Sequence, residues 1–134
     1  MPKFSNRSRK RLDTCDKRLQ CVMYAVIRYF DITIIEGYRN KVDQNKAFQL
    51  SRSRVKYPHG KHNKEPSQAV DVAPWIQGKT TNWNDTEMFH YMAGRIMATA
   101  DSLGIKLRWG ADWNRNQYSG DEKFLDMVHF ELDE

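Results

Sequence analysis

The segment GKHNKEPSQAVDVAP, residues 60–74, places an acidic side chain inside an otherwise apolar strand. It begins with polar, turn-forming residues and ends in an alternating run, residues 68–73, that predicts a β-strand. Alternation puts Val70 and Val72 on one face and Asp71, between two alanines, on the other. We expect the valines to meet the core and the carboxylate to have space beside it.

The period of the apolar residues predicts three helices and three further strands. Asn84 has the N-cap position of a capping box with Glu87, and Gly104 suits the position after the helix end. Helices and strands follow one another without a regular βαβ rhythm. We therefore predict a small α+β domain with helices flanking a mixed or antiparallel sheet. The predicted helices cover residues 8–30, 43–52 and 85–103, and the predicted strands residues 32–38, 105–109 and 128–132.

Composition is typical of a soluble globular protein, with 40% hydrophobic and 29% charged residues. We expect residues 1–134 to form a single domain without a separate wall-binding domain. No apolar run approaches the roughly 20 residues of a membrane span, so stable membrane insertion is not expected. The basic N-terminal segment is not followed by an apolar stretch, so it does not resemble a secretory signal. These features predict a protein that folds in a cytoplasm.

The net charge of +5 is concentrated near the N-terminus. Residues 1–18 hold seven Lys or Arg and two Asp, which accounts for the whole excess. Such a segment favours a polyanionic partner: nucleic acid, an anionic membrane surface or an anionic cell-wall polymer. A solvated helix face explains the same charges without any partner.

The chain has two cysteines, Cys15 and Cys21, and both fall at core-like positions of the predicted helix 8–30. We expect two buried free thiols. They do not form a CxxC pair, so the sequence does not predict a cysteine metal site.

The last predicted strand repeats the pattern seen around Asp71. Its apolar residues share one face, while His129 and Glu131 share the other. His62 lies in the loop before the Asp71 strand, so a His/Asp/His set becomes possible. A solvated His62, a structural His129 and a turn-capping Asp71 are the alternatives that residue types alone leave open. Three N/O ligands with an open fourth position are typical of catalytic zinc, and Asp126 would lie near its water as general base.

Several motifs, in order, resemble one enzyme family. The stretch GKHNKEPSQAVDVAPW is similar to the His and Ala-x-Asp motif of the zinc-dependent VanY-like D-alanyl-D-alanine carboxypeptidase superfamily. DMVHFEL resembles the closing signature of its phage branch, the L-alanyl-D-glutamate endolysins. EGYRNKVDQNKAF and RWGADW resemble two further segments of that branch. The resemblance covers roughly residues 30–132 and implies a Hedgehog/D-Ala-D-Ala-peptidase-like fold.

Residue by residue, the resemblance implies that Zn²⁺ is bound by His62, Asp71 and His129. It implies that Asp126 is the catalytic carboxylate. Glu131, beside His129, is a candidate for orienting that imidazole.

The resemblance also suggests residues for substrate. Arg39 falls where the family has an arginine that steadies a substrate carbonyl or carboxylate, so it is also a candidate catalytic residue. Gln44 matches a family glutamine, and Trp113, next to Asp112, belongs to the wall of the site. We group Arg39, Gln44 and Trp113 as substrate-binding residues.

Five positions bear on the match. Gly60 replaces a family serine, and Met127 and Val128 stand where proline is common. His59 is an alternative first ligand, although His62 has the family's Lys-His spacing. His90 lies in a predicted helix outside every motif, and we interpret it as structural.

The resemblance implies a phage endolysin that hydrolyses the L-alanyl-D-glutamate bond of the peptidoglycan stem peptide and so causes host lysis. Such a monomeric enzyme would wait in the host cytoplasm until a separate membrane pore opens. One alternative is a D-alanyl-D-alanine carboxypeptidase or dipeptidase with the same zinc site. Others are a small basic nucleic-acid-binding module, although no nucleic-acid partner is expected here, and a structural zinc domain, which usually has four protein ligands.

Overall fold

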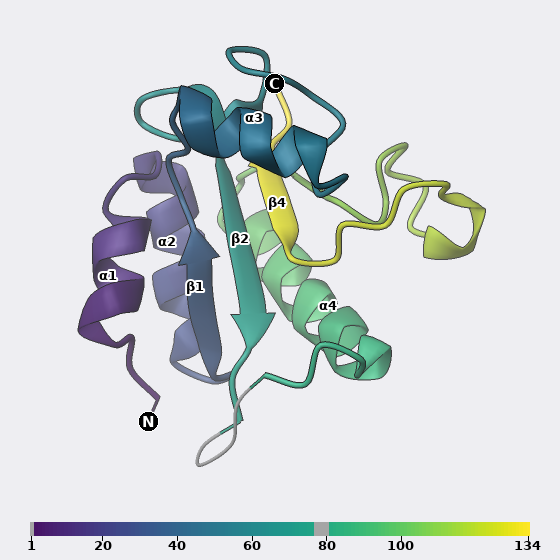
Figure 1. Ribbon diagram of the computed structural model, residues 1–134. Coiled ribbons are helices and arrows are strands. Elements are labelled where there is room, and N and C mark those ends of the chain that lie inside the picture. The colour runs from purple at the N-terminus through teal and green to yellow at the C-terminus, as the bar shows by residue number, and fades with distance from the viewer. Residues whose placement is uncertain (1, 77–80) are drawn as a thin grey trace.

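Four strands form one sheet in the computed structural model, which describes residues 2–76 and 81–134 (Figure 1). The strand order is β1-β2-β4-β3, and every neighbouring pair is antiparallel. This confirms the predicted α+β class and selects the antiparallel form of the sheet. The strands are β1 (Ile32–Glu36), β2 (Ala69–Pro74), β3 (Leu107–Trp109) and β4 (His129–Leu132).

The helices divide between the two faces of the sheet. Helices α2 (Lys17–Ile27) and α4 (Thr86–Ser102) pack together behind it, and α1 (Asn6–Leu12) packs on β1 (Figure 1). Helix α3 (Lys41–Gln49) crosses in front of the sheet near its upper end in the same view. Two short 3-10 turns, η1 (Lys61–Asn63) and η2 (Ser119–Asp121), lie in the loops.

The main core fills the space between the rear helices and the sheet. Val70, Val72 and Phe130 contribute from the strands, and Met92 and Ile96 from α4. This confirms that the valines of the segment 60–74 meet the core. The opposite face of β2 is buried as well, because all six residues of the strand are buried. Polar side chains surround Asp71 on that face, and a cavity of about 670 Å³ also borders it, in line with the space expected there.

The helix predicted over residues 8–30 is wrong as one element, because the chain breaks between α1 and α2. Residues around Cys15 form an isolated parallel bridge with Ser67, in which the Asp16 amide donates to the Ser67 carbonyl over 2.9 Å. The Asp16 side chain then caps α2 by accepting from the Arg18 amide. Aspartate competes for backbone amides in this way, so it favours a helix start over a helix interior.

That break also separates the two cysteines. Cys15 is a buried free thiol as predicted, but Cys21 is exposed on α2, so its predicted burial is wrong. Burial raises the pKa of the Cys15 thiol to about 12, which keeps it protonated.

The ends of the other elements differ from the predicted ends by one to three residues. Asp85, not Asn84, caps α4 by accepting from the Met88 amide, so the predicted capping box is wrong by one position. Asn40 caps α3, which therefore starts and ends earlier than the predicted helix 43–52. Gly104 follows α4 with a φ of +72°, which confirms its predicted position at the helix end.

Candidate active site

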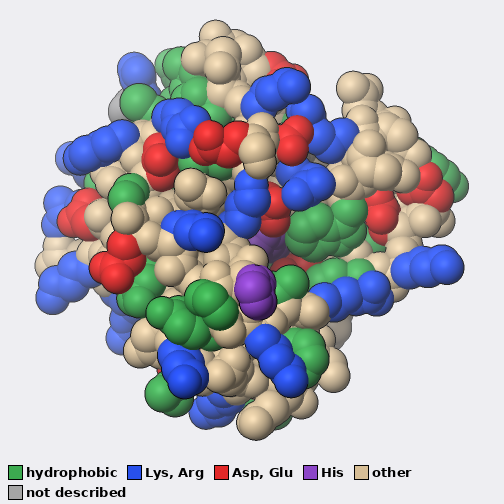
Figure 2. All heavy atoms as spheres, turned by 90° about the horizontal axis from the view of Figure 1, so that it is seen from above, with side chains coloured by type: hydrophobic (Ala, Val, Ile, Leu, Met, Phe, Trp, Pro, Cys, Tyr) green, Lys and Arg blue, Asp and Glu red, His purple; other side chains and the backbone are tan. Residues whose placement is uncertain are grey.

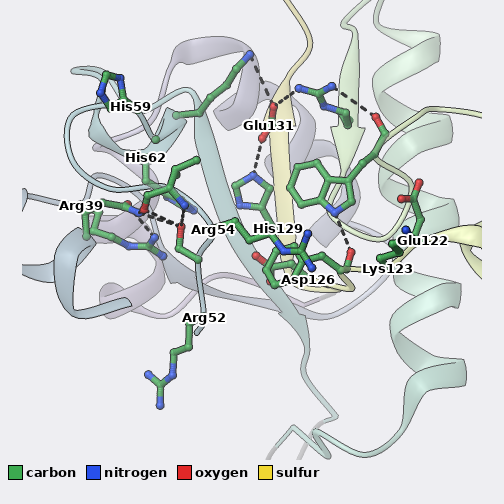
Figure 3. A pocket seen from close by; sticks show the side chains of 18 of the residues that line it. Arg39, Arg52, Arg54, His59, His62, Glu122, Lys123, Asp126, His129 and Glu131 are labelled. Atoms are coloured by element: carbon green, nitrogen blue, oxygen red, sulfur yellow. Dashed lines mark hydrogen bonds and ion pairs between the residues drawn. The ribbon is translucent and has the colours of Figure 1, made fainter. Parts of the chain in front are cut away.

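Three potential metal ligands, His62, Asp71 and His129, meet on the front face of the sheet. Figure 3 shows the two histidines with the residues around them. One ligand atom from each lies within 4.8 Å of the other two, and all three residues are buried. The sheet creates this group, because Asp71 of β2 lies directly opposite His129 of β4. Turn η1, which ends six residues before β2, supplies His62.

Hydrogen bonds orient both imidazoles toward Asp71. His62 donates from Nδ1 to the Gly37 carbonyl over 2.6 Å, so its Nε2 faces Asp71 Oδ1 at 3.0 Å. His129 directs Nε2 to Glu131 Oε1 at 2.8 Å, so its Nδ1 lies 3.4 Å from the same Asp71 oxygen. Each imidazole thus has its outer nitrogen bound and its inner nitrogen turned to a common point, as in protein metal sites.

The charges around this point favour a bound cation. Burial alone would lower the pKa of His129, but its hydrogen bonds to Asp71 and Glu131 raise that pKa to about 10. Burial alone would raise the pKa of Asp71, yet the two imidazoles hold it well below its usual range. Two ionised carboxylates therefore flank the imidazoles. A metal ion bound there would take the place of the His129 proton, and two imidazoles, then neutral, with a carboxylate form a donor set that fits Zn²⁺.

Two basic side chains interact with the second carboxylate oxygen of Glu131. Its Oε2 accepts from Arg108 Nη2 over 2.9 Å and lies 3.8 Å from the ammonium of Lys61. Burial alone would raise the pKa of Glu131, but His129 and Arg108 lower it to about 2. Glu131 is thus an ionised acceptor for His129, which agrees with the orienting role predicted for it.

Arg39 joins the ligand group to the neighbouring strand. Its guanidinium forms a two-bond ion pair with Glu36, at 2.8 and 3.2 Å, and approaches Asp71 Oδ2 at 3.4 Å. Gln44 accepts from Arg39 over 3.0 Å and donates to the Val55 carbonyl over 2.7 Å. Gln44 is only 1% exposed, so the structure gives it the geometry of a positioning residue for Arg39. Substrate contact by Arg39 and Gln44 stays a prediction.

Asp126 enters the site through a turn held by Gly110. The Asp126 amide donates to the Gly110 carbonyl over 2.7 Å, and the Gly110 amide donates to the His129 carbonyl over 2.8 Å. A Cβ atom at Gly110 would collide with the Asp126 backbone oxygen. The glycine of RWGADW therefore permits the close approach that positions Asp126 without a proline at Met127 or Val128. Burial and the nearby Asp71 carboxylate raise the pKa of Asp126 to about 6.

Several of these groups, among them His62, His129 and Asp126, line a cavity of about 640 Å³, a size usual for ligand sites. Trp113 forms part of its wall, with its ring stacked on Phe124 and tilted against His129 at centroid distances of 6.1 and 5.5 Å. Its indole N–H donates to the Phe124 carbonyl over 2.9 Å. Figure 2 shows Lys and Arg side chains around the hollow, with histidine side chains among them.

The other two histidines lie outside the ligand group. His59 is exposed, borders the same cavity and points away from the imidazole of His129 (Figure 3). His90 faces the Thr86 carbonyl at 2.7 Å and Ser119 Oγ at 3.1 Å, and its ring packs edge-on against Trp109. The structure therefore groups His62, rather than His59, with Asp71 and His129, and gives His90 structural contacts.

Comparison with known proteins identifies the family of the chain. The family of phage L-alanyl-D-glutamate peptidases matches residues 1–133. The chain belongs to this family. The L-alanyl-D-glutamate peptidase of Escherichia phage T5 is 35% identical over 122 residues, which cover 90% of this chain and 88% of that protein. The resemblance inferred from the motifs is thus confirmed.

The fold of this phage peptidase is also found in a solved structure. The crystal structure of the Serratia marcescens L-Ala D-Glu endopeptidase ChiX matches with a TM-score of 0.75 and 22% identity, over 98% of this chain and 90% of that one. This likeness supports the predicted peptidase-like fold. Within the described residues, no helix is long and apolar enough to span a bilayer.

Sequence reasoning missed several groups that build the site of this phage peptidase. Gly37 contributes a carbonyl, and Lys61 and Arg108 contribute charges around Glu131. Gly110 is part of the RWGADW motif, but the motif alone gave no reason for a glycine there. The Gly37 signal was present in GYR, because a glycine at a strand end often permits close backbone approach. The roles of Lys61 and Arg108 depend on strand register, which no local pattern reveals.

Proposed function

We propose that the chain is a zinc-dependent endolysin that hydrolyses the L-alanyl-D-glutamate bond of the peptidoglycan stem peptide. The convergence of His62, Asp71 and His129, with Asp126 bordering the same cavity, is the observation that carries this proposal. Membership of a phage peptidase family supports the substrate class. A two-histidine, one-carboxylate set leaves a coordination position open, as catalytic zinc requires.

The residues have distinct parts in the proposed reaction. When bound, zinc supplies a Lewis acid for the scissile carbonyl and a nucleophilic water at neutral pH. Asp126 accepts the proton of the attacking water and passes it to the leaving amine. Its pKa of about 6 suits a base that is ionised at neutral pH and can hold a proton transiently.

The remaining polar residues hold these groups in position. Glu131 fixes the orientation of His129, and the Gly37 carbonyl does the same for His62. Arg39, held by Glu36 and Gln44, places its positive charge near both Asp71 and Asp126. We infer that this charge also stabilises negative charge on the substrate carbonyl as the amide bond breaks. Trp113 would form the wall against which substrate lies.

Host lysis would follow from this activity once a membrane pore, formed by another protein, gives access to the wall. We infer that the enzyme acts as a monomer, because all the proposed site residues come from one chain. Nucleic acid is not needed for any step.

Digestion of purified peptidoglycan tests the proposal directly. Mass spectrometry should reveal a new amino terminus on D-glutamate, which disappears with a chelator and returns with added zinc. Release of free D-alanine would instead identify a carboxypeptidase with the same site. Folded, zinc-loaded protein that cleaves nothing would contradict an enzymatic function on this substrate.

A further inference from the structure

The cleft continues past the metal ligands in two directions. The cavity of about 640 Å³ contains His62 and His129, and a second cavity, of about 670 Å³, contains Asp71. Both cavities are bordered by Arg39, Phe124 and Asp126, so they are two arms of one cleft that meet at the site. A substrate whose scissile bond lies beside Asp126 therefore extends into both arms.

The first arm has free positive charge. Arg54 and Lys123 border it, and neither forms an ion pair within residues 2–76 and 81–134. The Arg54 guanidinium is held over the Phe124 ring at 4.6 Å. Unpaired cations of this kind favour a carboxylate. Because stem-peptide D-glutamate is linked through its side-chain carboxyl, its α-carboxylate is free on the leaving side of the bond.

The second arm has a tryptophan in its lining. Trp83 borders this arm together with apolar residues such as Ile35, Leu50 and Leu125. One side of the Trp83 ring stacks on Phe89 of α4 at a centroid distance of 5.9 Å and an interplanar angle of 29°. The indole nevertheless stays 58% exposed. A ring fixed from one side and open on the other offers a rigid apolar surface at little entropic cost.

The same ring also borders a third hollow, of about 700 Å³, which contains Trp75 and the basic residues Lys3, Arg7 and Arg11. Trp83 is thus the junction between the catalytic cleft and a surface that is both aromatic and cationic. An indole surface and positive charge suit an amphipathic, anionic polymer better than a neutral peptide.

The two halves of the proposed substrate match the two arms in their chemistry. On the amino side of the scissile bond, one L-alanine is followed by the lactyl group of a muramic acid sugar. Counting two links of roughly 3.5 Å each, the sugar begins about 7 Å from the scissile carbonyl. It therefore reaches the second arm when the carboxylate-bearing half occupies the first.

We propose that Trp83 is the binding platform for the muramic acid sugar, with the D-glutamate half of the substrate in the arm of Arg54 and Lys123. The inference rests on the proposed endopeptidase function and adds the orientation of the substrate and a preference for peptides still attached to glycan. The apolar face of the sugar ring lies on the open face of the indole. Trp83 is then a specificity-determining residue and takes no part in the chemistry.

Two matched substrates test this inference. One is N-acetylmuramyl-L-alanyl-γ-D-glutamyl-diaminopimelic acid, and the other is the same tripeptide with an N-acetyl group in place of the muramyl sugar. Wild-type zinc enzyme should cleave the muramyl substrate with the higher kcat/KM. Trp83→Ala should lose roughly tenfold in kcat/KM on the muramyl substrate, the order expected for one desolvated aromatic ring, and stay within about twofold of wild type on the N-acetyl substrate.

Two further variants separate a sugar contact from a folding effect. Trp83→Phe keeps an aromatic platform and should recover most of the lost kcat/KM. Trp75→Ala alters an exposed tryptophan outside the second arm. This variant should cleave the muramyl and the N-acetyl substrate with the kcat/KM of wild type. Thermal unfolding of each variant shows whether loss of the Phe89 contact alone changes stability.

The outcomes distinguish the inference from the proposed function. An equal loss on both substrates, or no loss on either, overturns the role of Trp83 while leaving the endopeptidase function intact. Wild-type enzyme that cleaves neither substrate overturns both. A loss confined to the muramyl substrate and recovered by Trp83→Phe supports the sugar platform.

Discussion

The two faces of strand β2 are both buried, yet they are built in different ways. Behind the strand, Val70 and Val72 pack into a continuous apolar core. In front of it, Asp71 is enclosed by His62, His129 and Arg39, each at a specific hydrogen-bonding or ion-pair distance. Apolar packing is non-directional and tolerates volume-conserving change, whereas a buried polar network loses much of its value when one partner is removed.

This difference predicts that substitutions in front of the sheet change chemistry and substitutions behind it change stability. The largest effect is expected for His129→Ala, because it removes a ligand and leaves Asp71 and Glu131 without the imidazole between them. Zinc content, measured by elemental mass spectrometry, and peptidoglycan hydrolysis should be lost together. His90→Ala is the matched control and should retain both. A fully active, zinc-loaded His129→Ala would exclude the proposed site.

Asp126→Asn should separate metal binding from catalysis. We expect zinc content to stay at the wild-type level, while kcat falls roughly 10³-fold, within the range for a lost general base. Near wild-type turnover by this variant would show that Asp126 is not the base.

The pH profile of the wild-type enzyme tests the same residue. A general base must be ionised, so activity should fall as the pH drops through the pKa of Asp126. That pKa is raised to about 6 by burial and by Asp71, and a bound cation would lower it, so the acid limb should lie at or below about pH 6. An acid limb well above that value would indicate a different titrating group.

Glu131→Gln should have a smaller effect, because the amide still accepts a hydrogen bond from His129 but no longer carries charge. We expect zinc affinity to fall roughly 10- to 100-fold, as for other residues that orient metal-bound histidines. Competition with a chelator measures this change. Glu122→Gln alters a carboxylate on the rim of the same cavity and should leave zinc affinity unchanged.

The same contrast explains what the sequence could predict. The valine pattern was sufficient to predict β2 and its core face, because apolar alternation is a local signal. The break between α1 and α2 was missed, because Cys15 and Leu12 continue a helical apolar period while the decisive contact, with Ser67, is remote in sequence. Local patterns cannot show which distant backbone a segment will meet.

For the site, motif resemblance suggested His62, Asp71 and His129, and the fold brings them together. The supporting groups were harder to predict, because they depend on register and close approach. Arg108 reaches Glu131 only because β3 pairs with β4, and Asp126 reaches the cleft only because Gly110 has no side chain.

Behind the sheet, Val72→Ala should change stability alone. Removing two buried methyl groups should lower the free energy of unfolding by about 2 kcal/mol, measured by urea denaturation. Turnover per folded, zinc-loaded molecule should equal that of wild type, although Val72 adjoins Asp71. A fall in turnover without loss of stability would show that the two faces are not independent.

The smallest effect is expected far from either face, on α1. Arg7, Arg9 and Lys10 are exposed there, whereas the Arg11 guanidinium donates to the Ile34 carbonyl and is best left unchanged. If these three charges steer the enzyme to an anionic wall, changing them to Gln should slow peptidoglycan digestion a few-fold at low salt. At about 1 M salt the rate should not change, because the screening length is then only about 3 Å. The same change at Lys41, Lys64 and Lys106, which are exposed and lie outside the basic segment, keeps net charge equal and is the control. Equal slowing by both triple variants would show that net charge alone causes the effect. An unchanged rate would show that the charges of α1 do not steer the enzyme and only face solvent.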